Sequence, residues 1–440
     1  MAKSEVLHMD DRAYGTSTSL VAKALHLFNE AKLNECIDKD DYVVIKAHLG
    51  EWNNTGYLRP VYVRAIVDKV KELGGRPFVV ETTTLPYAPF CFRTNGWDLY
   101  MTAERNGFNS GTVGCPVIVG DGFLGTDDVR IDLPEGYILK EQYVATAVAC
   151  ADSMIVLSHF KGHPWGVFGG AIKNVGVGCA SKRGKYNLHM GAHPVLGMQT
   201  MEYIPGYCGG RECSKWETCN SICPEGALVV PEKGPIEFIK ELCNGCTCHM
   251  FTTLDCGVFA NLKLIDWFEA TCVAVADSAK ACMNTFEPGK VGFLNFGLDS
   301  TPWCDCIPYS DRAIIPNMGI FASKDPVAID RACLDMAVKS IAMPGSVAEE
   351  KDATKGRPKF SVSGSFLGVS EDIQCNVGQE IGLGSKDYEL KDIEPMESAK
   401  PTFLHQQPAG LVLRRFYKKI DPVPKEGFKR VEEPDITKVR

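Results

Sequence analysis

The sequence predicts an α/β fold with a layered, mainly parallel sheet that is interrupted by one small cysteine-rich insertion. Three observations carry this prediction. Apolar strand-like segments alternate with segments of helical periodicity, eight cysteines gather in one short stretch, and that stretch breaks the alternation. The chain has 440 residues, which is enough for two or three domains.

The alternation starts with a buried strand at 41–47, a helix at 60–74 and a second strand at 76–81. We expect further strands at 153–157, 290–295 and 320–323, and helices at 143–150, 270–283 and 326–341. Strand–helix–strand repeats need crossover connections, which favour a parallel sheet.

These patterns divide the chain into four parts. An α/β domain occupies 1–205 and resumes at 257–392, and the insertion occupies 206–256. A proline-rich, charged tail follows at 393–440. The tail either wraps the body or a partner subunit, or it is disordered.

Composition excludes several classes of protein. The first twelve residues are polar and lack the apolar core of a signal peptide. No run of about 18 apolar residues predicts a membrane span. The net charge of −8 argues against nucleic acid as a general partner. We therefore expect a cytoplasmic protein, in which thiols stay reduced and clustered cysteines bind metal.

The cysteine-rich stretch has the spacing of ferredoxin-like cluster loops. Cys219, Cys223 and Pro224 reproduce the end of the bacterial C-x2-C-x2-C-x3-C-P run, and Cys243 and Cys246 have the expected two-residue gap. Two [4Fe–4S] clusters need about eight thiolates. The predicted ligands are Cys208, Cys213, Cys219, Cys223, Cys243, Cys246, Cys248 and Cys256.

The division of these ligands between the clusters stays open. If the fourth cysteine of each run crosses over, one site uses Cys219, Cys256 and either Cys208 or Cys213. The other uses Cys223, Cys243, Cys246 and either Cys248 or His249. Trp216 stands where the usual run has a cysteine, and its indole either shields a cluster or simply packs. A structural zinc site and unmetallated thiols are the alternatives to iron–sulfur clusters.

Residues 153–200 contain no Asp or Glu, although the chain as a whole is acidic. The stretch holds nine glycines and several lysines. Glycine lets backbone N–H groups approach a ligand and lysine adds charge, so we predict a pocket for an anionic small molecule or cofactor, with a flavin as one candidate. A solvated basic loop or an inter-domain surface is the alternative. The candidate residues are Lys161, Lys173, Lys182, Gly169, Gly170 and Asn174.

Histidines stand in the same stretch in two pairs, each four residues apart. That spacing suits a metal on a helix, but Gly162, Pro164 and Pro194 disfavour helices there. Contact with an anion or proton transfer is the favoured role, with His163 or His193 as proton donor.

Other candidates follow the predicted strands. Lys46, His48 and Glu81 stand at strand ends, where open α/β sheets bind ligands. The Cys304–Asp305–Cys306 motif is a third metal anchor, a pair of redox thiols or a plain loop.

The chain resembles domain-of-unknown-function family 362, whose members are often described as uncharacterised iron–sulfur-centre proteins. The resemblance covers most of residues 40–340 and rests on 41–60, 158–185, 187–194, 304–306 and 319–332. Members commonly carry a two-cluster ferredoxin segment between the last two of these blocks. Here the segment lies ahead of 304–306 and its cysteine spacing is altered. The resemblance implies a redox setting.

Together these features favour a cytosolic iron–sulfur oxidoreductase of anaerobic metabolism. Two clusters would pass electrons to the anion pocket, with His163, His193, Lys161 and Lys173 as catalytic residues. Residues expected to hold the cofactor are Lys46, His48, Glu81, Gly169, Gly170, Asn174 and Lys182.

Two alternatives remain open. The first is a reductase or activator that docks on another protein, such as a corrinoid enzyme. The second is a binding protein with purely structural clusters. The partners considered are a ferredoxin-like electron donor or acceptor and a second copy of the chain.

Overall fold

The computed structural model describes residues 3–85, 91–197, 201–223, 225–243, 256–261, 264–365, 367–395 and 424–430. The chain divides into two units, Met1–Ala399 and Lys400–Arg440. The sheet, its helices and the cysteine-rich segment belong to the first unit. Most of the predicted tail lies outside the described residues, so its role stays a prediction.

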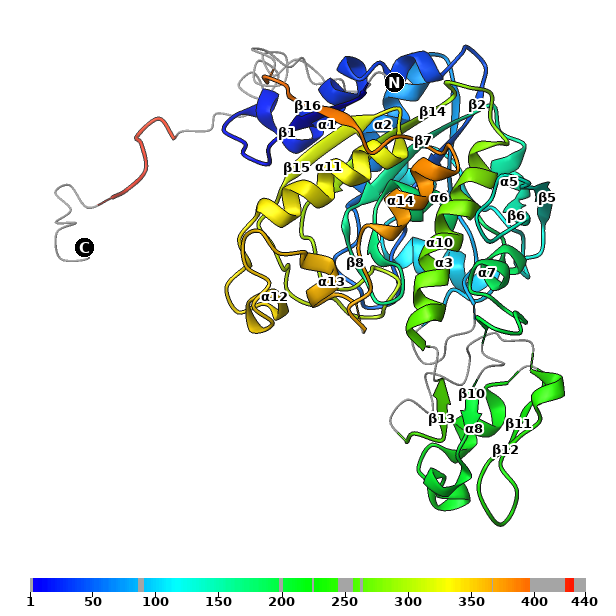
Figure 1. Ribbon diagram of the computed structural model, residues 1–440. Helices are drawn as coiled ribbons and strands as arrows, with labels where there is room; N and C mark the ends of the chain where they lie inside the picture. The colour runs from blue at the N-terminus through cyan, green and yellow to red at the C-terminus, as the bar shows by residue number, and fades with distance from the viewer. Residues whose placement is uncertain are drawn as a thin grey trace. The chain divides into compact units, whose positions relative to one another are not determined.

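An eight-stranded sheet forms the centre of the first unit (Figure 1). Seven strands run parallel to one another and only β15 runs antiparallel to them. This confirms the predicted α/β fold with a mainly parallel sheet. In spatial order the strands are β16 (Tyr388–Asp392), β1 (Ser4–Met9), β15 (Gly319–Ser323), β14 (Val291–Gly297), β7 (Ser153–His159), β2 (Tyr42–Lys46), β3 (Arg76–Glu81) and β4 (Val117–Val119).

The central strands are buried on both faces, because successive side chains of a strand point to opposite sides. In β7, Met154 and Val156 enter one core, while Ile155 and Leu157 enter the other. The second core packs against α1 (Leu20–Glu30) and α2 (Pro60–Glu72). The first core packs against α6 (Ala171–Gly176), α10 (Leu264–Met283), α11 (Pro326–Lys339) and α14 (Ile373–Glu380). The result is a three-layer arrangement with helices on both faces (Figure 1).

One predicted element is wrong in its first half. The sequence predicts a helix over 143–150, whereas the structure has strand β6 (Glu141–Ala145) and then the one-turn helix α5 (Thr146–Ala149). β6 pairs with β5 (Asp128–Asp132) in a two-stranded sheet. Periodicity cannot separate strand from helix in so short an apolar segment, and here the cross-strand partner decides.

The remaining elements of the body are short. The hairpin of β8 (Lys161–His163) and β9 (Val167–Gly169) leads into α6. The other helices are α3 (Gly96–Arg105), α4 (Ser110–Val113), α7 (Lys182–Leu188), α12 (Val347–Glu350) and α13 (Lys359–Ser363).

The described part of the cysteine-rich segment has its own small fold. Its elements are β10 (Met201–Tyr203), α8 (Trp216–Ser221), β11 (Leu228–Val229), β12 (Glu237–Phe238) and β13 (Phe259–Asn261). The first and last strands pair with each other, and so do the two middle strands. Leu228, Val230, Ile236 and Val258 form its core.

The sheet has a point at which the strand order reverses. β3 and β4 continue from β2 in one direction, while β7 and β14 lie on its other side. All five strands are parallel, so their carboxyl ends share one edge of the sheet. In open α/β sheets this reversal opens a crevice in which ligands bind.

Gly162 lets the loop after β14 lie directly against β8. Its N–H donates to the carbonyl of Thr301 at 2.9 Å. A Cβ on Gly162 would lie 1.9 Å from the carbonyl oxygen of Pro302. Because the obstacle is backbone, no side chain can rotate away to make room. The segment Lys161–His163 therefore needs a glycine at its centre, because only glycine allows this close packing.

We predict that Gly162→Ala lowers the free energy of unfolding by about 1–3 kcal/mol, since the added methyl overpacks this contact. Gly15→Ala is the matched control, because nothing lies within 4 Å of a Cβ at that position. The control should change stability by less than about 0.5 kcal/mol. Denaturant unfolding followed by circular dichroism measures both variants, and equal stabilities would contradict the prediction.

Candidate functional site

A cavity of about 470 Å³ lies at the carboxyl edge of the parallel strands. Much of its wall is apolar or aromatic, including Trp165, Phe268, Trp303 and Tyr309. An apolar cavity with a few convergent polar groups is the usual form of a small-molecule site. The acidic, basic and histidine side chains that line it are His48, Glu81, Arg93, His163, Lys173, Lys185 and His189.

Two cysteines after β14 meet a histidine after β7 at this cavity. The candidate ligand atoms of His163, Cys304 and Cys306 lie within 4.8 Å of one another. His163 Nε2 is 3.7 Å from Cys306 Sγ, and Lys173 Nζ is 3.6 Å from Cys304 Sγ. Thiolate and imidazole are ligands that zinc and other transition metals accept, so the three side chains form a candidate metal site.

The two thiols share one proton. Burial alone would raise the pKa of Cys304, but the hydrogen bond from Cys306 and the charges of Lys173 and Lys161 lower it well below its ordinary value. The hydrogen bond to Cys304, together with burial, raises the pKa of Cys306 well above its ordinary value. Cys304 therefore carries the negative charge of the pair.

The His163 ring has a defined proton position. Its Nδ1 accepts the backbone N–H of Gly166 at 2.8 Å and that of Trp165 at 3.3 Å. A backbone N–H only donates, so Nδ1 holds a lone pair and Nε2 carries the proton. Burial and the charge of Lys173 hold the pKa of His163 well below its ordinary value, so the ring is neutral.

Asp305, between the two cysteines, anchors their loop. Its carboxylate contacts His159 Nδ1 at 2.9 Å and Lys161 Nζ at 2.9 Å, and all three side chains are buried. Burial alone would raise the pKa of Asp305, but His159 and Lys161 lower it below its ordinary value. The carboxylate stays charged and ties the loop to the end of β7.

The ends of β2 and β3 meet in a second buried ion network. Lys46 Nζ is 3.1 Å from Glu81 Oε1, and Arg93 lies 3.8 Å from Glu81 and 3.0 Å from Glu51. None of the four side chains is more than 4% exposed. Burial alone would raise the pKa of Glu81, but Lys46, His48 and Arg93 lower it below its ordinary value.

Helix α7 brings Lys185 and the adjoining His189 to the cavity. Lys185 Nζ donates to Thr82 Oγ1 at 2.5 Å and to the carbonyl of Ala180 at 2.7 Å. Burial lowers the pKa of Lys185 to about 8, although Asp121 and Glu81 oppose the shift. Burial and the charges of Lys173 and Lys185 lower the pKa of His189 to about 3, so its ring is neutral.

The structure brings together five of the sequence-predicted site residues. His48, Glu81, His163, Lys173 and Asn174 all line the cavity. Lys46 and Lys161 are buried beside them, in their ion pairs with Glu81 and Asp305. The roles of these seven residues stay predictions.

The other four predicted residues belong neither to the cavity lining nor to these ion pairs. Gly169 and Gly170 lead into α6, where the N–H groups of Ala171 and Ile172 donate to Asp330 at 2.7 and 2.9 Å. An internal carboxylate thus occupies the start of that helix. Lys182 Nζ donates to the carbonyl of Thr94, and His193 Nδ1 accepts the N–H of Leu196 at 2.8 Å. Their binding and catalytic roles also stay predictions.

Sequence reasoning missed Arg93, Lys185 and His189 as site residues. Lys185 and His189 stand four apart in the acid-free stretch, a spacing that places both on one face of a helix and could have identified them. Arg93 follows no recognisable local pattern. Its place in the site depends on the tertiary contacts with Glu81 and Glu51.

The cysteine-rich segment positions several of its predicted ligands. Cys208 Sγ accepts N–H groups from Gly210 at 3.4 Å and Ile236 at 3.2 Å, and Cys223 Sγ accepts that of Ala227 at 3.2 Å. Hydrogen bonds to sulfur tune cluster potentials and stabilise thiolates. Cys213, Cys219, Cys243 and Cys256 are half-buried. Pro224, Cys246, Cys248 and His249 lie outside the described residues.

Trp216 packs against the small core of the segment. The guanidinium of Arg211 lies 4.8 Å from the centre of its ring. These contacts support packing as one role of the indole.

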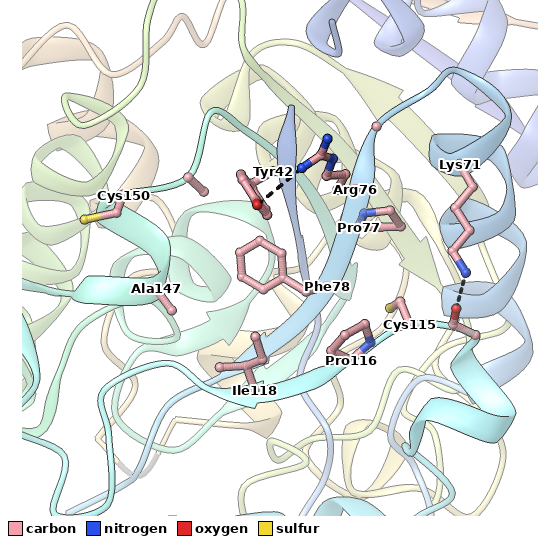
Figure 2. Close-up of a pocket in the computed structure, with 13 residues that line it drawn as sticks. Tyr42, Lys71, Arg76, Pro77, Phe78, Cys115, Pro116, Ile118, Ala147 and Cys150 are labelled. Carbon is pink, nitrogen blue, oxygen red and sulfur yellow. Dashed lines mark hydrogen bonds between the residues drawn. The ribbon is translucent and has the colours of Figure 1, made fainter. Parts of the chain in front are cut away.

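A second hollow, of about 690 Å³, lies beside β3 and β4 (Figure 2). Its wall is mainly apolar, with Phe78 and Ile118 among the lining residues. Its cations already have partners: Arg76 donates to Tyr42 at 3.4 Å, and Lys71 donates to the carbonyl of Gly114. The smaller cavity has the convergent charged groups, so we assign the candidate site there.

Within the described ranges, no helix has both the length and the apolar character needed to cross a membrane.

Comparisons with known proteins identify one family. The family model described as domain of unknown function (DUF362) matches residues 43–335, which include the parallel strands of the cavity and the cysteine-rich segment. No curated protein matches the chain significantly. Among solved structures, the chain is similar to the lactate racemase apoprotein from Thermoanaerobacterium thermosaccharolyticum, with 11% identity and a TM-score of 0.32. The match covers 67% of this chain and 50% of the racemase, so the chain spans about half of that protein's length.

We predict that the Lys185 amine reacts with acetic anhydride along a pH curve centred near pH 8, because burial lowers its pKa to about 8. Mass spectrometry of digests taken at successive pH values measures the curve. Lys351, an exposed lysine, is the internal reference. Coincident curves for the two lysines would show that the cavity does not perturb Lys185.

Proposed function

The chain belongs to the DUF362 family, and we propose that it is an iron–sulfur redox protein that acts on an anionic small molecule or cofactor held in the cavity. The observation that carries this proposal is the convergence of a hydrogen-bond donor, a cation and two thiols on one buried site. His163, Lys173, Cys304 and Cys306 provide these groups.

The charge of the cavity supports an anionic ligand. Arg93, Lys173 and Lys185 line it, whereas its one acidic lining residue, Glu81, is paired with Lys46 and Arg93. Lys161, Lys173 and Lys185 are each 8% exposed or less. Buried lysines suit a bound small molecule better than a surface that docks on another protein, so the small-molecule function is favoured over the activator.

The cysteine-rich segment supports iron–sulfur ligation. Cys219 and Cys223 keep the spacing that ends a bacterial cluster loop, and the sulfur atoms of Cys208 and Cys223 accept backbone N–H groups, as the sulfur ligands of clusters do. The eight predicted cysteines would hold two [4Fe–4S] clusters, which supply single electrons when bound.

We predict that protein purified without air contains about eight iron and about eight sulfide per chain. Its visible absorbance should bleach on addition of dithionite, and a paramagnetic signal should appear. Cys219→Ser and Cys223→Ser should each lose iron and signal, because each removes a ligand. Cys150→Ser changes an exposed thiol outside the segment and is the matched control. A colourless protein that contains only zinc would contradict the proposal.

A further inference from the structure

We propose that Cys304 and Cys306 form a thiol–disulfide couple that exchanges two electrons with a small-molecule disulfide in the cavity. The inference rests on the proposed function, because it needs the same cavity to bind a small molecule, but it does not need the iron–sulfur clusters. The two cysteines stand in different positions. Cys306 lines the cavity, whereas Cys304 is fully buried.

The loop brings the two sulfur atoms together. The N–H of Ile307 donates to the carbonyl of Cys304 at 3.1 Å, which closes a turn over the motif. The ion pair of Asp305 with Lys161 holds the turn in place. The sulfur atoms lie within 4.8 Å of each other. A disulfide between them therefore requires the two sulfur atoms to approach each other to about 2 Å within one turn of the chain.

Three hydrogen-bond donors surround the sulfur pair. Cys304 Sγ is 3.6 Å from Lys173 Nζ and accepts the N–H of Cys306 at 3.4 Å. Cys306 Sγ is 3.7 Å from the protonated Nε2 of His163. Thiolate is the reactive form of cysteine, and neighbouring cations and donors stabilise it.

The same geometry disfavours a metal at this position. A histidine that binds metal through one nitrogen normally donates a proton from the other. Here Nδ1 of His163 accepts two backbone N–H groups, so the proton stays on Nε2, which faces Cys306. His163 is therefore a donor to sulfur and not a ligand. Lys173 also places a positive charge beside Cys304, which opposes a bound cation.

The exchange needs no reductant other than the two cysteines, and every proton in it has a source and a destination. The Cys304 thiolate takes the proton of Cys306, and the Cys306 thiolate attacks one sulfur of the bound disulfide. The S–S bond of the ligand breaks, and the leaving thiolate takes the proton from Cys304. The Cys304 thiolate then attacks Cys306 Sγ, which forms the Cys304–Cys306 disulfide and releases the second half of the ligand as a thiolate. Two electrons have passed from the cysteines to the ligand.

Cys91, which also lines the cavity, is not suited to replace Cys306 as the nucleophile. Cys91 Sγ contacts the carbonyl of Cys306 at 3.9 Å. Burial raises the pKa of Cys91 to about 12 and its thiol faces a carbonyl, whereas Cys306 has the Cys304 thiolate beside it to take its proton.

The experiment uses the full-length protein, purified without air and equilibrated with mixtures of oxidised and reduced glutathione. Acid quenching, alkylation and mass spectrometry then locate disulfides. We expect one internal disulfide, Cys304–Cys306, whose yield rises with the oxidised fraction. Cys272 should stay reduced, since burial raises its pKa to about 12.

Single variants separate the roles of the two cysteines. Cys304→Ser should accumulate a mixed disulfide between Cys306 and glutathione, because the resolving thiol is gone. Cys306→Ser should not accumulate one, because Cys304 does not line the cavity. Lys173→Met should slow alkylation of the pair by iodoacetamide at neutral pH about tenfold, which corresponds to one pKa unit. Lys280→Met, on α10, is the matched control and should leave the rate unchanged.

Three results would overturn the inference. They are no internal disulfide at any glutathione ratio, pairing of Cys306 with Cys91, or one zinc per chain that the Cys304→Ser/Cys306→Ser double variant loses. Iron analysis of the same samples tests the clusters separately. Protein without iron that still forms the disulfide refutes the proposed function alone, and the reverse result refutes the couple alone.

Discussion

The buried carboxylate of Asp305 is the contact on which the candidate site depends. It joins the loop after β14 to His159 at the end of β7 and to Lys161 at the start of β8. A charged group without water needs partners, and removal of one partner from a buried ion pair typically costs about 3–5 kcal/mol. The two cysteines flank this carboxylate, so their position against His163 and Lys173 follows from the ion pair. The close approach at Gly162 completes the same junction.

Sequence patterns predicted the fold class and five of the eight strands of the sheet, because these elements satisfy local and global requirements together. The apolar run Val43–Ile45 is buried on both faces, as a central parallel strand requires, and Pro60 begins the helix that follows it. The strand–helix–strand pattern also predicted that Lys46 and Glu81 lie at the carboxyl ends of their strands, and the structure shows these two strands as neighbours. Residues 143–150 show the limit, since pairing with β5 determines their strand and the sequence does not reveal that partner.

Site residues that share a sequence motif could be predicted. Residues that reach the site only through tertiary contacts could not. His163, Lys173 and Asn174 could be found because they share the acid-free stretch. Arg93 reaches the cavity through ion pairs with residues from two other segments. Gly169 and Gly170 show the opposite case. A glycine-rich helix start indicates an external anion, but the carboxyl group of Asp330, far along the chain, occupies that position from within the protein.

The pairing of β10 with β13 has a consequence for the history of the chain. Both ends of the cysteine-rich segment leave it side by side, because Met201 lies opposite Asn261. A segment whose ends meet can be gained, lost or replaced with little change in the path of the surrounding chain. Exchange of the cysteine-rich segment for another segment would therefore leave the walls of the cavity in place.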